Sequence, residues 1–239
     1  LKYIPLKNHE RRQLSSFGPT SLYFYYRMSG PYLKWLAGQG ILERYGPRLF
    51  PMEGRGMDQV DLRIYKLNPL NRNIWPFPKK PVHLDESKRP PGPGEEPGYA
   101  VSLRSQIQLL GSPLVSKIVP LPLKTGTGMR FGIDLRTHFA RISGDNQPGH
   151  YLIGYRVIGS ATRRSYVRVQ VTDLCLSTVE EENAVNFVVT SLKTGVPIPG
   201  ATVKVEGTIG RRRSPRYKWK VFLQGTTGPD GTFRYVHKS

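Results

Sequence analysis

The sequence predicts an all-β protein built from two antiparallel β-sandwiches in tandem, and three observations support this. Apolar and polar residues alternate in short segments, most clearly in Asp58–Leu67, where Val60, Leu62 and Ile64 are separated by polar side chains. Successive side chains of a strand point to opposite faces, so this period of two indicates a half-buried strand. Turn-forming stretches such as Gly144–Gly149 separate these segments at short intervals. Sustained helical periodicity is nearly absent.

The other elements of the first domain follow from the same patterns. A short helix is expected within Pro31–Tyr45, because its apolar residues are spaced as on one helix face. Asn68–Gly98 is rich in proline, which lacks the N–H donor of a β-ladder, so it is expected to form a long loop. The remaining segments are expected to be strands: Tyr99–Leu110, Leu114–Val119, Met129–Leu135, Tyr151–Val157 and Val167–Val171.

A second domain is expected to begin near Asp173. Its predicted strands are Leu174–Leu176, Val185–Thr190, Ala201–Val205, Tyr217–Leu223 and Phe233–Tyr235. An immunoglobulin-like sandwich has about 100 residues, whereas residues 173–239 number only 67, which predicts an incomplete domain. The domain map is therefore a lead-in segment at 1–40 that we cannot place, a sandwich at 41–172 with a proline-rich insertion at 68–98, and a truncated sandwich at 173–239. No Gly, Pro or Ser linker interrupts Val167–Leu176, so a nearly continuous crossing is expected there.

The chain is strongly basic, with 36 Lys and Arg against 17 Asp and Glu, a formal net charge of +19. Such a charge favours anionic partners. The basic residues are spread along the chain, however, so we favour a piece of a longer polypeptide whose acidic residues lie elsewhere. One cluster is a candidate anion-binding site, in which basic residues alternate with Tyr217 and Trp219. Basic residues beside aromatic ones can bind phosphates and stack on bases, but a solvated edge strand has the same composition and is the interpretation we favour. The basic members of this cluster are Arg211, Arg212, Arg213, Arg216, Lys218 and Lys220.

No catalytic group, cofactor or metal site is predicted. The five histidines are scattered, without the spacing of metal ligands. Cys175 is the single cysteine, which excludes an internal disulfide, and its apolar neighbours Leu174 and Leu176 predict a buried, inert thiol. Glu180–Glu182 is expected to be a solvated hairpin tip. A sugar-directed β-sandwich enzyme is disfavoured, because no pair of carboxylates stands out on the predicted strands. No apolar run approaches the ~20 residues of a membrane span.

Several motifs occur together in an order that resembles the N-terminal macroglobulin-like domains of bacterial alpha-2-macroglobulins. A strand ends in Thr172-Asp173-Leu174, and the next domain carries T-G-x-P-x-x-G-A-x-V at residues 194–203 and T-x-x-D-G-x-F at residues 227–233. Residues 148–152 are similar to the P-G-x-Y-L of the last strand in the preceding domain, and Asp58–Tyr65 to its early strand. The second domain's motifs alone also occur in transthyretin-like and collagen-adhesin-like modules. Cys175 and the long 68–98 insertion depart from the pattern, since the family usually has glycine at the cysteine position.

The resemblance implies a non-catalytic scaffold or binding fragment of a bacterial envelope protein. Members of the family are large periplasmic or envelope-associated proteins that trap proteases, often with a thioester motif Cys-x-Glu-Gln. Cys175 is followed by Leu176, Ser177 and Thr178, so it is not that cysteine. The implied partners are target proteases, envelope proteins and further domains of the same parent chain. The alternative is a basic module that binds nucleic acid or an anionic envelope polymer, although nucleic acid is not the partner we expect.

Overall fold

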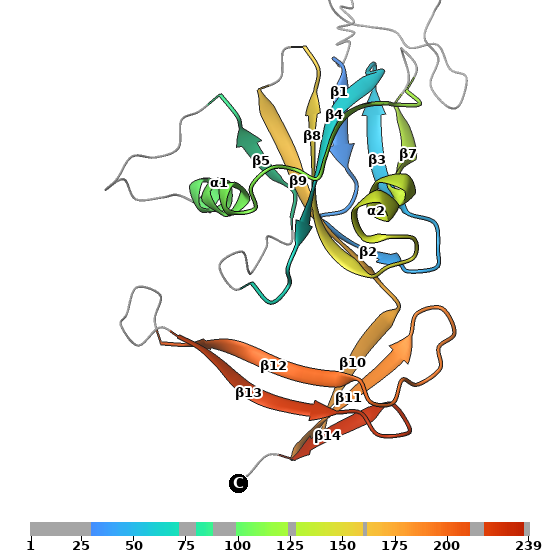
Figure 1. Ribbon diagram of the computed structural model, residues 1–239, viewed down its shortest axis with the longest axis vertical. Coiled ribbons are helices and arrows are strands. Elements are labelled where there is room, and N and C mark those ends of the chain that lie inside the picture. Colours follow the sequence, from blue (N-terminus) through green and yellow to red (C-terminus); the bar gives the residue numbers. More distant parts are fainter. Residues whose placement is uncertain are drawn as a thin grey trace, which may run out of the picture. The chain divides into compact units, whose positions relative to one another are not determined.

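The computed structural model describes residues 30–71, 80–87, 99–123, 128–159, 162–210 and 218–236. The first part of the chain forms two packed sheets (Figure 1). The smaller sheet has the order β1-β3-β7 and consists of β1 (Tyr32–Trp35), β3 (Leu49–Arg55) and β7 (Met129–Asp134). The larger sheet has the order β2-β9-β8-β4-β6, with β5 also paired to β9. Its strands are β2 (Gln39–Glu43), β4 (Gln59–Leu67), β5 (Val82–Asp85), β6 (Val115–Pro120), β8 (Gly149–Val157) and β9 (Arg163–Thr172).

The pairings of these strands are antiparallel, as predicted, except for the parallel pair β2–β9. Two strands, β2 and β5, pair with the same edge of β9. Residues Gln39–Glu43 of β2 pair with its C-terminal half, and Val82–Asp85 of β5 pair with its N-terminal half. One long strand therefore holds together two segments that are about forty residues apart in the sequence.

The main core fills the space between the two sheets. The alternation predicted for residues 58–67 is confirmed, because Val60, Leu62 and Ile64 of β4 have no exposed surface. Trp35 of β1 packs edge-on against Phe50, with ring centroids 5.3 Å apart. Burial of apolar surface contributes roughly 25 cal/mol per Å², so this layer is the main source of stability of the first sandwich.

The opposite face of the large sheet is also covered by apolar side chains, and this overturns one prediction. Residues 99–110, expected to be a strand, form α1 (Tyr99–Leu109) (Figure 1). Ile107 of α1 joins a second cluster with Tyr65 and Tyr166, against which Leu110 also packs. A spacing of three residues places Ile107 and Leu110 on one side of a helix, so the helix covers a sheet face that would otherwise expose apolar surface.

Two further expectations are corrected, and one helix was not expected. The helix expected within residues 31–45 is instead β1 and β2, because β2 passes so close to the core that a Cβ on Gly40 would lie 2.2 Å from the Phe50 ring. The expected loop at 68–98 contains the strand β5. A helix, α2 (Arg136–Ser143), was not predicted. It has two turns and one buried side chain, Phe139, stacked on Tyr151 at 4.0 Å, which is too little periodicity to recognise in a sequence.

The last part of the chain contains the five strands predicted there. A three-stranded sheet has the order β10-β11-β14, and β12 pairs with β13 (Figure 1). Phe187, Val189 and Val203 form their common core. Among the described residues, these strands pair only with one another. Their bounds are β10 (Leu174–Glu180), β11 (Ala184–Ser191), β12 (Thr202–Ile209), β13 (Lys218–Thr226) and β14 (Thr232–Val236).

A single residue, Asp173, separates β9 from β10. Its carboxylate accepts hydrogen bonds from the Ser191 hydroxyl at 2.9 Å and from the Lys193 backbone N–H at 3.0 Å. Its backbone carbonyl accepts another from the Leu192 N–H at 2.7 Å. The turn after β11 is therefore fixed to the crossing, which agrees with the prediction of a nearly continuous connection. Strand β1, which lies inside the predicted lead-in segment 1–40, pairs with β3.

Candidate functional site

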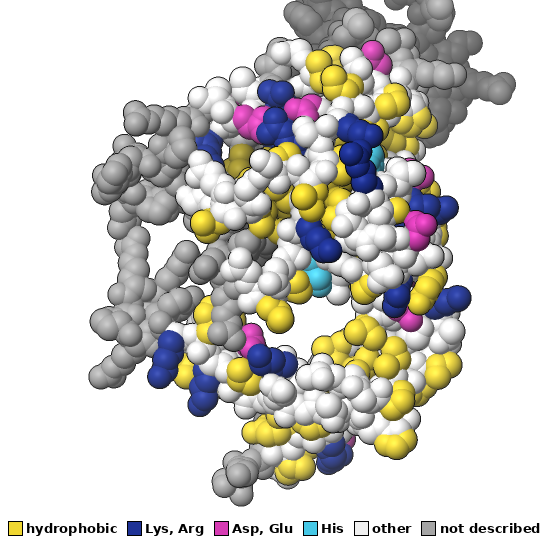
Figure 2. Space-filling model, viewed as in Figure 1, with side chains coloured by type: hydrophobic (Ala, Val, Ile, Leu, Met, Phe, Trp, Pro, Cys, Tyr) yellow, Lys and Arg dark blue, Asp and Glu magenta, His cyan; other side chains and the backbone are white. Residues whose placement is uncertain are grey.

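The predicted anion-binding cluster is only partly within the described residues. Lys218 and Lys220 are exposed on β13 with Trp219 half-buried between them, and the Lys220 ammonium lies 5.7 Å from the centre of the Phe222 ring. Arg211, Arg212, Arg213, Arg216 and Tyr217 lie outside the described residues. On the face seen in Figure 2, lysine and arginine side chains are scattered singly or in small groups among uncharged ones. The cluster remains a prediction.

The structure places the other residues considered from the sequence as follows. Cys175 is half-buried, not buried, because it lies on β10 at the edge of its sheet beside the exposed Leu174 and Leu176. The predicted hairpin tip at Glu180–Glu182 is confirmed: Glu180 ends β10, Glu181 and Glu182 follow it, and all three are exposed. The backbone N–H of Glu181 bonds the Ala184 carbonyl at 2.8 Å.

The histidines that are described do not form a site. His83, His138 and His150 lie on β5, α2 and β8, and burial lowers the pKa of His138 and of His150. Within the described ranges, no group of three His, Cys, Asp or Glu side chains could hold a metal ion. No helix in those ranges is long and apolar enough to cross a membrane.

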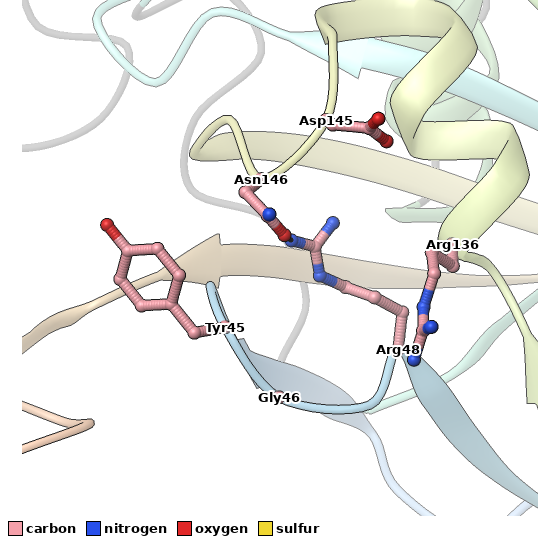
Figure 3. A pocket seen from close by; sticks show the side chains of 6 residues that line it. All are labelled: Tyr45, Gly46, Arg48, Arg136, Asp145 and Asn146. Carbon is pink, nitrogen blue, oxygen red and sulfur yellow. Dashed lines mark hydrogen bonds between the residues drawn. The ribbon is translucent and has the colours of Figure 1, made fainter.

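The structure shows a polar pocket that the sequence had not suggested, which we name the Arg48 pocket (Figure 3). Three connections of the first sandwich meet there: the turn between β2 and β3, the start of α2, and the turn between α2 and β8. The pocket has a volume of about 290 Å³. Its lining residues are Tyr45, Gly46, Arg48, Arg136, Asp145 and Asn146.

Local hydrogen bonds explain why these connections meet. The Gly46 N–H bonds the Glu43 carbonyl at 3.2 Å and closes the turn after β2. The carbonyl of Arg48 accepts the Leu135 N–H at 2.9 Å, which ties the start of β3 to the start of α2. Asn146 has φ = 52°, a left-handed conformation that asparagine tolerates better than most residues. The turn predicted at residues 144–149 thus forms one wall of the pocket.

Arg48 is the central residue of the pocket and is only 3% exposed. Its guanidinium points at Asn146 (Figure 3). One terminal nitrogen, Nη2, donates to the Arg44 carbonyl at 2.5 Å and to Asn146 Oδ1 at 3.3 Å. Its Nε is buried and has no hydrogen-bond acceptor among the described residues. Burying a charged group without a counter-charge is costly, so this arrangement leaves Arg48 incompletely satisfied.

The charges around the pocket are predominantly positive. Arg136, the exposed first residue of α2, lines it together with Arg48, and Asp145 is the acidic lining residue. Within the described part of the chain, Asp145 forms no ion pair with either arginine. Arg44 lies beside the pocket, where its Nε donates to the Asn146 carbonyl at 2.5 Å. The guanidinium of Arg44 also lies 5.2 Å from the centre of the Tyr45 ring.

A second buried arginine, Arg164 of β9, shows what full pairing looks like in the same sandwich. It has no exposed surface, and its guanidinium bonds the carboxylates of Asp61 at 2.5 Å and Glu86 at 2.7 Å. It also donates to the Asp61 carbonyl at 2.8 Å. Burial by itself raises the pKa of Asp61, but the hydrogen bond and charge of Arg164 outweigh it and hold that pKa below its usual value. Arg164 therefore belongs to a structural ion pair, whereas Arg48 keeps N–H groups that have no acceptor among the described residues.

Comparison with known proteins gives a match in structure alone. No family model and no curated protein sequence matches the chain. Among solved structures, alpha-2-macroglobulin of Escherichia coli spanning domains NIE-MG1 matches with a TM-score of 0.59 and 13% identity, over 89% of this chain and 90% of that one. The same protein spanning MG0-NIE-MG1 matches with a TM-score of 0.54 and 12% identity, over 87% of this chain and 58% of that one.

A longer structure, trypsin-activated alpha-2-macroglobulin of Escherichia coli, matches with a TM-score of 0.54 and 12% identity. That match covers 86% of this chain but 14% of the other. The chain thus has the fold class of macroglobulin-like β domains. In particular, it matches the N-terminal NIE-MG1 domains of bacterial alpha-2-macroglobulin, so the resemblance inferred from the sequence motifs is confirmed at the level of fold.

Proposed function

We propose that this chain is a non-catalytic scaffold and protein-binding segment of a bacterial alpha-2-macroglobulin-like protein of the periplasm or cell envelope. The observation that carries the proposal is the match to the NIE-MG1 domains over nine-tenths of the chain. The domains that it resembles are non-catalytic. We further propose that residues 41–172, together with β1, and residues 173–239 correspond to two consecutive domains.

The sheet β10-β11-β14 supports a role in contacts with other protein segments. Leu176 of β10 pairs with the buried Val189 of β11 and lies on the same side of the sheet. Leu174 and Leu176 are nevertheless 54% and 57% exposed. Exposed apolar side chains next to a core are typical of surfaces that another segment covers. The partners we propose are further domains of the parent chain, envelope proteins, and proteases, since one matched structure is a trypsin-activated form.

The first experiment is to determine the intact mass and N-terminal sequence of the native protein from a cell-envelope fraction. The proposal predicts a chain much longer than 239 residues, processed from an exported precursor. A mature product confined to these 239 residues, recovered from the cytosol, would contradict it.

A second experiment separates this proposal from the alternative of an anion-binding module. Affinity for generic DNA and for an acidic glycan is measured across a salt titration for the wild type and for the triple variant Arg211→Ser, Arg212→Ser, Arg213→Ser. A diffuse charge makes few simultaneous phosphate contacts, so binding is expected to be weak and to vanish by physiological salt in both proteins.

The matched control for that titration removes the same charge from exposed residues elsewhere, namely Lys66, Lys117 and Arg163. If the basic cluster were a dedicated site, the Arg211–Arg213 variant alone would lose most of its affinity, and the slope of log affinity against log salt would fall by up to about three. Sub-micromolar DNA binding at physiological salt would overturn the scaffold proposal.

A further inference from the structure

The Arg48 pocket contains a buried positive charge that the described residues do not neutralise. Arg48 is 3% exposed, and its hydrogen bonds go to a backbone carbonyl and an amide oxygen, both of them neutral. Its buried Nε has no acceptor among the described residues. Arg164, equally deep in the same sandwich, is bonded to two carboxylates. We propose that the Arg48 pocket binds a carboxylate, which supplies the counter-charge that Arg48 lacks.

The form of the pocket favours a carboxylate over a phosphate. A guanidinium binds a planar carboxylate through its N–H donors, and the bonds of Arg48 to Arg44 and Asn146 use only Nη2, which leaves Nη1 for a ligand. Arg136, exposed at the start of α2, adds a second positive charge to the lining. Asp145 also lines the pocket and would repel a doubly charged phosphate more strongly than a singly charged carboxylate.

The size of the pocket limits what can enter it. A volume of about 290 Å³ is at the lower end of the roughly 300–1,000 Å³ of sites for drug-sized ligands. It suits one small acid, or one acidic side chain of a bound peptide, whose flanking residues could contact the half-exposed Tyr45 ring. The shared chemistry is the carboxylate, and the experiment below distinguishes a free acid from a peptide.

The test is a titration of ¹⁵N-labelled protein at constant ionic strength, followed by the amide resonances of Gly46, Asp145 and Asn146. The probes are acetate, a blocked tripeptide with a central aspartate, the same tripeptide with asparagine, and inorganic phosphate. Saturable shifts of these amides with acetate and the aspartate peptide are expected, and none with the asparagine peptide. An aspartate peptide that binds about tenfold more tightly than acetate identifies an acidic peptide as the ligand, whereas equal affinities identify a free small acid.

Variants test whether these residues form the site. Arg136→Gln removes an exposed charge and is expected to leave the melting temperature unchanged while weakening carboxylate binding by about tenfold. Asp145→Asn removes the repelling charge and is expected to strengthen binding by about threefold, a gain that a merely structural role would not produce. Arg163→Gln, exposed on β9 and outside the pocket lining, is the control with the same charge change as Arg136→Gln. Arg48→Gln is expected to abolish binding, and because Arg48 is buried, the two surface variants decide the test if it does not fold.

Three results would overturn the proposal. The first is the absence of saturable shifts at the three amides with any carboxylate probe. The second is carboxylate binding that Arg136→Gln and Asp145→Asn leave unchanged. The third is saturation by phosphate without any response to acetate or the aspartate peptide, which would assign the pocket to a different anion.

Discussion

Glu86 accepts a hydrogen bond from the Nε of Arg164 at 2.7 Å, although 78 residues separate them in the sequence. Glu86 directly follows β5, the strand inside the proline-rich insertion, and Arg164 lies on β9, the strand with which β5 pairs. The ion pair therefore fixes the residue after β5, in the middle of the insertion, to the large sheet. It also compensates a guanidinium that has no exposed surface.

Replacing Glu86 by glutamine should destabilise the protein by about 2 kcal/mol. Removing one partner of a buried pair costs about 3–5 kcal/mol, and the cost here is lower because Asp61 remains and a quarter of the Glu86 side chain is exposed. The measurement is the free energy of unfolding in urea. The control is Arg63→Gln, which removes a partner of Glu86 that lies at 3.2 Å and is more exposed than Arg164, and it should cost at most about 1 kcal/mol. Equal losses in the two variants would show that the burial of Arg164 does not matter.

Stability should fall on acidification, partly through Glu53. Lys34 and Arg130 lie directly opposite it on the neighbouring strands. Hydrogen bonds from Lys34, Arg130 and Tyr32 lower the pKa of Glu53 from 4.5 to about 2. Because the folded pKa is lower than the unfolded one, this contribution is present above about pH 4.5 and is lost as the pH falls toward 2.

The corresponding measurement is the urea midpoint at pH 6 and at pH 3 for the wild type and Glu53→Gln. The midpoint of the variant should fall less between the two pH values than that of the wild type. Glu180→Gln, which removes an exposed carboxylate of β10, serves as the control and should behave like the wild type. An identical drop in wild type and Glu53→Gln would contradict the assignment.

Replacing Gly40 by alanine should cost about 1–3 kcal/mol through overpacking. A Cβ at this position would lie 2.2 Å from the ring of Phe50, which is fully buried and cannot move aside freely. Gly30→Ala has open space around the new methyl group and should change the free energy of unfolding by less than about 0.5 kcal/mol. A double variant with Phe50→Leu tests the contact. The double variant should lose less free energy of unfolding than the two single variants lose together, and full additivity would show that the clash is relieved elsewhere.

Truncation of Leu176 and of Val189 should have very different effects, although the two residues are paired across β10 and β11. Val189 is 5% exposed and its change to alanine should cost about 1–3 kcal/mol, whereas Leu176 is 57% exposed and Leu176→Ala should cost less than about 0.5 kcal/mol. Unfolding curves of the two variants provide the comparison. A large loss for Leu176→Ala in the isolated chain would mean that another segment of this chain covers β10.

The alternation of apolar and polar residues was sufficient to predict the strands that bury one face in the main core. Val60, Leu62 and Ile64 face the main core, whereas the intervening Asp61 and Arg63 lie on the other side of β4. The turn at residues 144–149 was predicted because it combines side-chain acceptors, a proline of fixed φ and a permissive glycine, and Gly144 and Asn146 do have positive φ. These features depend on residues that are neighbours in the sequence, and so they could be found without the structure.

Contacts between distant segments decided the rest. Residues 99–109 form a helix because the second face of the large sheet is apolar and needs covering, and Gly40 lies in a strand because β2 runs beside β9 and close to Phe50. Arg48 looks like any other surface arginine in the sequence. It is buried only because turns about 100 residues apart meet around it, as its bond to Asn146 shows. The sequence alone determines which residues can form strands and turns, whereas the burial of a charge depends on which of these elements pack together.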